Sequence, residues 1–291
     1  MTDCMITVGS WETRFLKGFE GAVKKFRPHN VVLFFYKEYA TWSAKNRRES
    51  AKLCKEQGII FKDCELSFSK HKDLWNVLYG IVTHLNVGNG CVLLDITTMP
   101  RETIWIMLDL LDARGIMVKY VYNQPERYNP KWLSRDPDEP RLVYKLSGEP
   151  KMGIPTKLLV LTGYDVDRVR QLIRFFQPQE TLLGLQTGNQ LANQAFNVEK
   201  SKRAFEKERA IDFFEVDAYA ADHGFNSIKT QLDAHIGNSN MIMSSLGPKL
   251  SAISLYKLHK IYPQTSLAYA PSKEFNRRYS YGVGLTHEGH L

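Results

Sequence analysis

One short segment, Asp95-Ile-Thr-Thr-Met-Pro-Arg101, combines residue types that hold anions. It follows an apolar run typical of a buried strand, so Asp95 is expected where that strand ends. Pro100 suits the first turn of a helix, and Arg101 could reach an anion held at the helix start. Thr97 and Thr98 offer hydroxyl groups that either contact a ligand or cap the helix. The pattern predicts an anion site at a helix N-terminus, with capping alone as the alternative.

A second segment, Ser244-Ser-Leu-Gly-Pro-Lys249, repeats this chemistry later in the chain. Ser244 and Ser245 supply hydroxyl groups, and Lys249 follows a proline as Arg101 does. In this alignment Met243 stands where the first segment has Asp95, so the two sites are expected to be similar but unequal. Asp95 is also the leading candidate for a catalytic residue, should the protein be an enzyme. The carboxylates Glu12, Asp165, Asp167 and Asp217 could converge with it from other strand ends for acid–base work.

The starts of the two halves also match. In each, an apolar run ends at a glycine, an aromatic residue and an acid follow, and an arginine stands five residues after the glycine: Gly9 with Arg14, and Gly163 with Arg168. A glycine there permits a tight turn and a close approach of a ligand to the backbone, and a plain strand-to-helix turn is the alternative. Gln186 opens a polar loop after the next strand of the second half. We predict that all five residues contact a ligand.

The last strand of each half ends in a further matched pair, Tyr122 with Asn129 and Tyr269 with Asn276, at the same spacing. The tyrosines could stack on a nucleobase while the asparagines read its edge. Aromatic lids and turn residues are the alternative explanation.

These segments belong to a regular alternation of short apolar runs with helical spacing. Such alternation is typical of parallel sheets covered on both faces. We expect an α/β fold of two tandem Rossmann-like units with mainly parallel sheets, related by internal duplication. The expected boundaries are 1–129 for the first unit, 130–155 for a proline-rich connecting segment that packs as a small hairpin, and 156–291 for the second unit. Ligands of open parallel sheets bind beyond the carboxyl ends of the strands, where all of these candidate residues would gather.

The net charge of +8, from 39 basic and 31 acidic residues, favours an anionic partner such as a nucleotide, a nucleic acid or an acidic protein. The chain contains neither a G-x-G-x-x-G nor a P-loop pattern, so no cofactor is expected. Its four cysteines include no C-x-x-C pair, and no metal site is expected. Without a signal-like start or a long apolar run, we expect a cytoplasmic protein with no membrane segment.

The segment from Asp95 to Arg101 resembles the Asp-x-Thr-Gly-Gly-Thr-Lys loop of CARF domains, Rossmann-like sensors of cyclic oligonucleotides in CRISPR-associated systems. The family's paired glycines are Thr98 and Met99 here. A fused pair of such units also resembles the SAVED domains of antiviral effectors. The resemblance implies that a ligand binds across the interface of the two units. The contributing residues would be Thr97, Thr98 and Arg101 from one unit and Ser244, Ser245 and Lys249 from the other.

The leading hypothesis is therefore a regulatory sensor that binds an anionic, nucleotide-derived ligand between two halves, in antiviral defence. Such a sensor would need a separate effector or partner protein. One alternative is an enzyme that cleaves a nucleotide-type ligand, a phosphodiesterase or a nucleosidase. Another is a scaffold subunit that binds nucleic acid or a partner protein. The sequence shows no nucleophile elbow or cysteine-protease signature.

Overall fold

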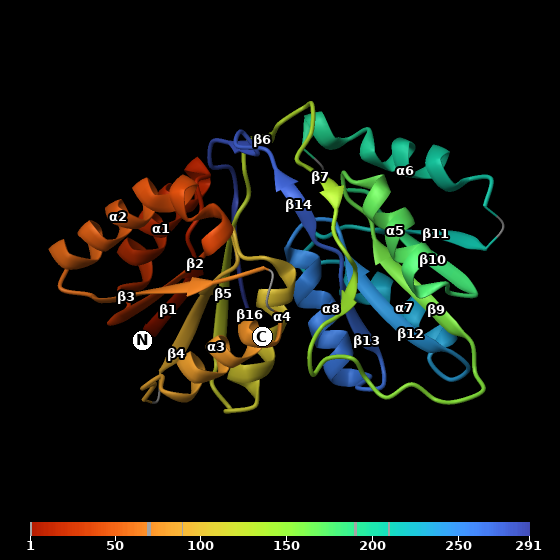
Figure 1. Ribbon diagram of the computed structural model, residues 1–291, viewed down its shortest axis with the longest axis horizontal. Coiled ribbons are helices and arrows are strands. Elements are labelled where there is room, and N and C mark those ends of the chain that lie inside the picture. The colour runs from red at the N-terminus through yellow and green to blue at the C-terminus, as the bar shows by residue number, and fades with distance from the viewer. Residues whose placement is uncertain (1, 69–70, 89, 189–190, 209) are drawn as a thin grey trace. The chain divides into compact units, whose positions relative to one another are not determined.

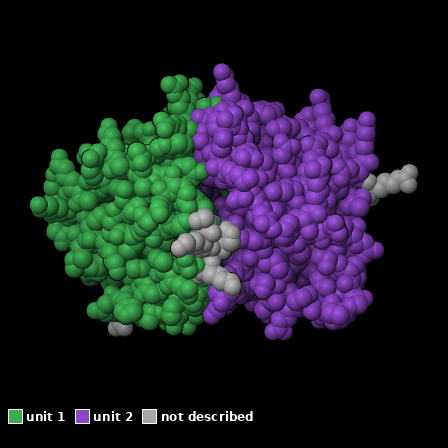
Figure 2. Space-filling model, viewed as in Figure 1, with its two compact units in different colours: residues 1–129, 277–291 green, residues 130–276 purple. Residues whose placement is uncertain are grey.

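The computed structural model describes the whole chain except residues 1, 69–70, 89, 189–190 and 209. The chain forms two compact units, which Figure 2 shows in different colours. Unit 1 comprises residues 1–129 together with 277–291, and unit 2 comprises residues 130–276.

Unit 1 is built on a six-stranded sheet with the order β16-β5-β4-β1-β2-β3. The strands are β1 (Thr2–Val8), β2 (Asn30–Tyr36), β3 (Ile60–Leu66), β4 (Cys91–Asp95), β5 (Val118–Asn123) and β16 (Thr286–His290). All neighbouring pairs are parallel except β16 with β5. The helices that connect the strands are α1 (Thr13–Phe26), α2 (Ala40–Glu56), α3 (His71–Thr83) and α4 (Arg101–Asp112), with a short 3-10 turn at Lys37–Tyr39.

Helices cover both faces of this sheet (Figure 1). Phe15, Phe19 and Val23 of α1 pack on Met5 and Leu33, which point to the same face of the sheet. Every second residue of a strand faces the same side, so these positions form one continuous apolar layer. Burial on both faces explains why the central strands read as nearly unbroken apolar runs.

Unit 2 has a sheet of the same size with the order β11-β10-β9-β12-β13-β8. Its strands are β8 (Arg141–Leu142), β9 (Thr156–Leu161), β10 (Glu180–Gln186), β11 (Ile211–Val216), β12 (Asn240–Ser245) and β13 (Ser266–Tyr269). Only the pairing of β8 with β13 is antiparallel. The helices are α5 (Val166–Phe176), α6 (Asn197–Phe205), α7 (Phe225–His235) and α8 (Leu250–Ile261), with a 3-10 turn at Ala192–Gln194.

Read from its antiparallel edge strand, each sheet has the same strand order. β16 corresponds to β8, β5 to β13, β4 to β12, β1 to β9, β2 to β10 and β3 to β11. The expected α/β fold with two mainly parallel sheets is confirmed. The origin of the two units by internal duplication stays a prediction that this shared topology supports.

The domain boundaries differ from those expected. Residues 130–155 form no hairpin of their own. Instead β7 (Ser134–Pro137) pairs with β14 (Ser272–Phe275), and β8 completes the sheet of unit 2. We call residues 130–142 the first arm.

The end of the chain behaves in the same way. Residues 277–290, which we call the second arm, return to unit 1. There β15 (Ser280–Tyr281) pairs with β6 (Arg127–Tyr128), and β16 pairs with β5. Each arm therefore follows the last strand of one unit and supplies an edge strand to the other.

Among the described residues, no helix is long and apolar enough to cross a membrane.

Candidate functional site

Asp95 ends β4 at the carboxyl edge of the unit 1 sheet, as expected, but its side chain is fully buried. One carboxylate oxygen accepts a hydrogen bond from Thr7 Oγ1 at 2.9 Å, and the other accepts one from the backbone N–H of Thr97 at 3.0 Å. These bonds hold the loop between β4 and α4 in place. The geometry favours a structural role for Asp95 over acid catalysis.

The two threonines of the same loop are also engaged within the protein. Thr97 Oγ1 accepts hydrogen bonds from the backbone N–H and from the side-chain amide of Asn123, both at 3.0 Å. Thr98 Oγ1 donates to the carbonyl oxygen of Val8 at 2.6 Å. The N-cap residue of α4 is Pro100 rather than a threonine. Both threonines instead attach the loop to the ends of neighbouring strands.

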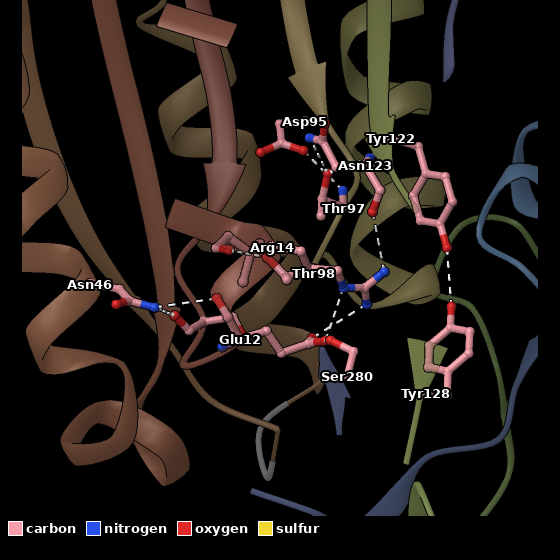
Figure 3. A network of polar contacts seen from close by, with 12 residues as sticks. Glu12, Arg14, Asn46, Asp95, Thr97, Thr98, Tyr122, Asn123, Tyr128 and Ser280 are labelled. Carbon is pink, nitrogen blue, oxygen red and sulfur yellow. Dashed lines mark hydrogen bonds and ion pairs between the residues drawn. The ribbon is translucent and has the colours of Figure 1, made fainter. Parts of the chain in front are cut away.

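Arg14 lies at the centre of the polar network in Figure 3, with its side chain 2% exposed. It forms an ion pair with Glu12 at 2.9 Å and donates to the carbonyl oxygen of Asn123 at 3.3 Å. Ser280 of the second arm donates to the same carboxylate of Glu12. Burial opposes the charge of Arg14, but Glu12 and the hydroxyls of Tyr128 and Tyr122 outweigh it and keep its pKa well above the usual value.

Unit 2 contains the counterpart of this network. Arg168 forms an ion pair with Asp165 at 3.0 Å and donates to the carbonyl oxygen of Ala270 at 3.0 Å. Ser134 of the first arm donates to Asp165 at 3.5 Å. Asp165 additionally caps α5 by accepting from two backbone N–H groups. The repeated arginines therefore join the first helix, the exit of the last strand and an arm in both units.

The two glycines turn out to hold different positions. The Gly9 N–H donates to Phe34 at 2.7 Å, and the equivalent N–H in unit 2 is that of Thr162, which donates to Gly184 at 2.8 Å. Gly163 is therefore one residue further along, where an added Cβ atom would lie 2.7 Å from the carbonyl carbon of Leu246. Gly163 is required for the close approach of two backbone loops.

Strand register also corrects the expected alignment of Asp95 with Met243. Asp95 pairs with Thr7 across β4 and β1, whereas Ser244 pairs with Val160 across β12 and β9, so Asp95 corresponds to Ser244. The two loops differ in length by one residue between this position and the proline, which misled an alignment by spacing alone.

The presence of Ser244 where unit 1 has Asp95 changes the hydrogen bonding of the two serines of unit 2. Val160 replaces the partner Thr7, and the buried hydroxyl of Ser244 has no hydrogen-bond partner among the described residues. Ser245 Oγ instead lies 2.7 Å from Ser251 Oγ, at the start of α8.

The matched tyrosines and asparagines are mostly buried and contact neighbouring protein segments. Tyr122 is 1% exposed, and its hydroxyl lies 3.2 Å from that of Tyr128. Tyr269 is 6% exposed beside Arg141, whose guanidinium carbon lies 5.2 Å from the ring centroid.

Asn129 and Asn276 hold the arms. The Asn129 N–H donates to Tyr279 at 3.0 Å, and the Asn276 N–H donates to Leu133 at 2.9 Å. The equal spacing of these residues from the tyrosines is therefore explained by structure. Their predicted contact with a nucleobase gains no support from these contacts.

Gln186, Arg101 and Lys249 remain as candidates to contact a ligand. Arg101 is the first residue of α4 and Lys249 is the N-cap residue of α8, and both are half-buried. Gln186 ends β10 and is 4% exposed. Its Oε1 accepts a hydrogen bond from Ala218 at 3.4 Å, while its buried Nε2 has no acceptor among the described residues.

The loop that leads to Lys249 passes directly over this amide, because a Cβ atom at Gly247 would lie 2.9 Å from Gln186 Nε2. The structure thus brings Gln186 next to the loop that begins α8. Residues 189–190, the end of the loop that Gln186 opens, lie outside the described residues.

Asn123 was not found from the sequence, whereas Glu12 and Asp165 were expected as acid–base groups and instead form ion pairs with Arg14 and Arg168. Asn123 joins Arg14, Thr97 and Thr286, whose hydroxyl donates to Asn123 Oδ1 at 2.9 Å. The acid after each first-strand glycine was visible in both halves and was the available signal for Glu12 and Asp165. Nothing in the sequence singled out Asn123. No cluster of three or more metal-ligating side chains occurs in the part of the chain that the structure describes.

Comparison with known proteins supports the fold only. No family model matches the sequence, and no curated protein matches it. A solved type III CRISPR defence DNA nuclease activated by cyclic oligoadenylate has a TM-score of 0.51 at 10% identity, covering 88% of this chain and 63% of that chain.

Two other solved structures are less similar. Can2 from Sulfobacillus thermosulfidooxidans in complex with cyclic tetra-adenylate has a TM-score of 0.32 at 11% identity over 40% of this chain and 31% of that chain. The cytoplasmic domain of a prokaryotic cation chloride cotransporter has a TM-score of 0.30 at 11% identity over 95% of this chain and 98% of that chain. The chain thus spans less than two thirds of the length of the type III CRISPR nuclease and of Can2.

Proposed function

We propose that the protein is a regulatory sensor that binds an anionic, nucleotide-derived ligand at the carboxyl ends of its strands. A basic residue stands at the start of the helix that follows β4 in unit 1 and β12 in unit 2. It is Arg101, the first residue of α4, in unit 1 and Lys249, the N-cap residue of α8, in unit 2. Helix N-termini carry partial positive charge and unpaired backbone N–H groups, and a neighbouring cation adds to their attraction for an anion. A separate effector or partner protein would respond to the bound state.

The observation that carries the proposal is the amide of Gln186. A buried donor without an acceptor costs about 1–3 kcal/mol, so native proteins keep few of them. This donor lies against Gly247, two residues before Lys249, at the sheet edge where ligands of α/β proteins bind. An acceptor oxygen of a ligand would satisfy the amide, and Lys249 would balance its charge.

The choice of a nucleotide-derived ligand is supported by the solved nuclease of similar fold, which is described as activated by cyclic oligoadenylate in type III CRISPR defence. The resemblance of Asp95–Arg101 to the CARF loop supports the same class of ligand. We extend the proposal to a role in antiviral defence on these grounds.

Binding is tested by calorimetry of the full chain with cyclic tetra-adenylate, AMP and ATP. Lys249→Ala and Gln186→Leu are expected to weaken binding about 10-fold or more, since a hydrogen bond to a charged group contributes about 1.5–3 kcal/mol. Arg101→Ala tests the corresponding helix start in unit 1. Lys260→Ala is the matched control, because Lys260 is exposed at the other end of α8 and its loss changes the net charge equally.

The proposal fails if the wild-type protein binds none of the three nucleotides. It fails equally if binding is the same in all variants as in Lys260→Ala. An enzyme that uses Asp95 is not favoured, because both carboxylate oxygens of that buried residue are hydrogen-bonded inside the protein. Incubation of each nucleotide with the protein, followed by mass spectrometry, would reveal any product.

A further inference from the structure

Unit 2 contains a pocket of about 620 Å³ at the exit of β9, between the first turn of α5 and helix α6. This volume falls within the range of about 300–1,000 Å³ that is usual for small-molecule sites. Its walls include the two aromatic residues Tyr164 and Phe196 and the cations Arg170, Lys200 and Arg203. Neither the predicted site residues nor the proposed function above accounts for it.

The aromatic wall is held in a defined geometry. The rings of Tyr164 and Phe196 are 6.4 Å apart and nearly perpendicular, at 79°. The Tyr164 hydroxyl donates to the carbonyl oxygen of Lys131 at 2.6 Å, which fixes the ring. Lys200 Nζ lies 4.5 Å from the centroid of the Tyr164 ring and donates to the Tyr164 carbonyl oxygen at 3.1 Å.

The equivalent place in unit 1 is filled by aromatic side chains. Because Thr162 corresponds to Gly9, Tyr164 corresponds to Trp11, and each lies two residues after that position. Phe196 corresponds to Tyr39, since each is the N-cap residue of the second helix of its unit. The rings of Trp11 and Tyr39 are 5.2 Å apart, much like the pair in unit 2.

Unit 1 adds a third ring, and unit 2 does not. Trp42, the third residue of α2, packs 5.0 Å from Trp11 and 5.2 Å from Tyr39, with the Arg277 guanidinium 4.5 Å from its ring. The third residue of α6 is Glu199, whose side chain is 60% exposed and paired with Arg203 at 2.8 Å. Glu199 lines the pocket. The two units therefore differ by one planar, cation-flanked aromatic group.

We propose that the pocket of unit 2 stacks a planar heteroaromatic ring of a ligand in the place that Trp42 occupies in unit 1. The pocket carboxylates are balanced locally, because Asp165, Asp167 and Glu199 each pair with an arginine. Lys200 belongs to none of the ion pairs of the described residues, so its charge is available to a phosphate. A ring with an attached phosphate is a nucleotide, so the inference rests on the ligand class of the proposed function and assigns that class a stacking site in unit 2.

The test uses the full chain with AMP and with ribose 5-phosphate, which lacks the base. Stacking of one base on an aromatic side chain is typically worth 1–3 kcal/mol, so Tyr164→Leu is expected to weaken AMP binding about 5- to 150-fold. Glu199→Trp, which places in unit 2 the residue that unit 1 has, is expected to fill the pocket and exclude AMP. Binding of ribose 5-phosphate should change less than 2-fold in Tyr164→Leu.

Phe175→Leu provides the control, because Phe175 is an exposed aromatic residue at the far end of α5. Unchanged melting temperatures establish that the variants fold, and Glu199→Trp gives an independent result should Tyr164→Leu unfold. The inference is overturned if AMP binds both variants as it binds Phe175→Leu.

The two proposals fail separately. If AMP binding is weakened by Lys249→Ala and Gln186→Leu but is unchanged in Tyr164→Leu and Glu199→Trp, only the proposed stacking site is rejected. Dependence on Tyr164 without dependence on Lys249 or Gln186 would remove the proposed site at the start of α8. Absence of AMP binding to the wild-type protein would remove the stacking site for AMP whatever the other nucleotides do.

Discussion

At the scale of single residues, the two units have different residue pairs at the same buried position. Unit 1 places the hydrogen-bonded pair Thr7 and Asp95 at the end of its central strands, and unit 2 places Val160 and Ser244 there. A polar pair inside a protein is stable only when both members are satisfied. Loss of the threonine partner therefore leaves the serine as an isolated buried hydroxyl.

This difference predicts opposite responses to similar substitutions. Thr7→Val should lower the free energy of unfolding by about 1–3 kcal/mol, because it leaves a buried oxygen of Asp95 without its donor. Ser244→Ala should be neutral or slightly stabilising, because it removes a buried hydroxyl that has no partner. Urea unfolding of both variants checks this. Equal losses of stability would contradict the assigned correspondence.

A second residue-scale prediction concerns His259 in α8. Burial lowers the pKa of His259, against a hydrogen bond with Thr265 that raises it. The unfolded chain, with a pKa of about 6.5, then binds more protons than the folded chain. Stability is fully present above about pH 6.5 and is lost as the pH falls through that value towards the lower folded pKa.

Unfolding measured at pH 7.5 and pH 5.5 should show a smaller loss of stability in His259→Gln than in the wild-type protein. His29→Gln is the control, because His29 is 63% exposed. A loss in His259→Gln as large as in the control would contradict the prediction.

At the scale of elements, α1 depends on a glycine where it crosses the end of β5. A Cβ atom at Gly18 would lie 2.8 Å from the side-chain Cγ of Asn123. Asn123 cannot move aside readily, because its side chain is bonded to both Thr97 and Thr286. Gly21 of the same helix has no atom within 4 Å of an added Cβ.

Alanine substitutions at these two glycines should therefore have opposite signs. Gly18→Ala is expected to destabilise unit 1 by about 1–3 kcal/mol through overpacking. Gly21→Ala should stabilise it by roughly 0.5–1 kcal/mol, because alanine loses less conformational freedom in a helix. Thermal unfolding of the two variants, compared side by side, measures both effects. A stabilising Gly18→Ala would show that Asn123 yields easily.

The central strands could be predicted from the sequence because a strand buried on both faces consists of consecutive apolar residues. Val31–Phe35 and Leu158–Leu161 are such runs, and both are central strands. The edge strand Thr286–His290 has no such apolar run, because it pairs with one strand only and its sequence is largely polar. The pairing of β16 with β5 and the resulting boundary were therefore not predictable from local pattern.

The candidate site was predictable in part for the same reason. Gln186 and Lys249 follow strands and were found by position along the chain. The ring cluster of Trp11, Tyr39 and Trp42, and its open counterpart beside Tyr164, depends on contacts between loops that are distant in sequence. Spacing along the chain also misplaced Asp95 against Met243, since a one-residue difference in loop length is visible only in strand register.

At the scale of the whole molecule, each unit is completed by an arm that follows the other unit along the chain. β16 covers the open edge of β5, and Ser280 completes the buried network of Glu12 and Arg14. The first arm contributes β8 and Ser134 to unit 2 in the same way.

Truncation after Asn276 should therefore damage unit 1 while leaving unit 2 intact. Faster amide hydrogen exchange is expected in β5 and α1, because β5 loses a neighbouring strand and Glu12 loses a donor. Exchange in β9 and α5 should stay unchanged and serves as the internal control. Equal acceleration in both units would show that the arm stabilises the molecule in a way that this division does not describe.

The return of the second arm also sets an order in time during synthesis. A ribosome releases the chain from the N-terminus onwards, and domains usually fold in that order as they emerge. Here all the strands of unit 2 lie within residues 130–276, whereas the sheet of unit 1 lacks an edge strand until residues 286–290 have been made. The unit that is translated first is thus the last to be finished, and its uncovered β5 edge must stay unpaired until then.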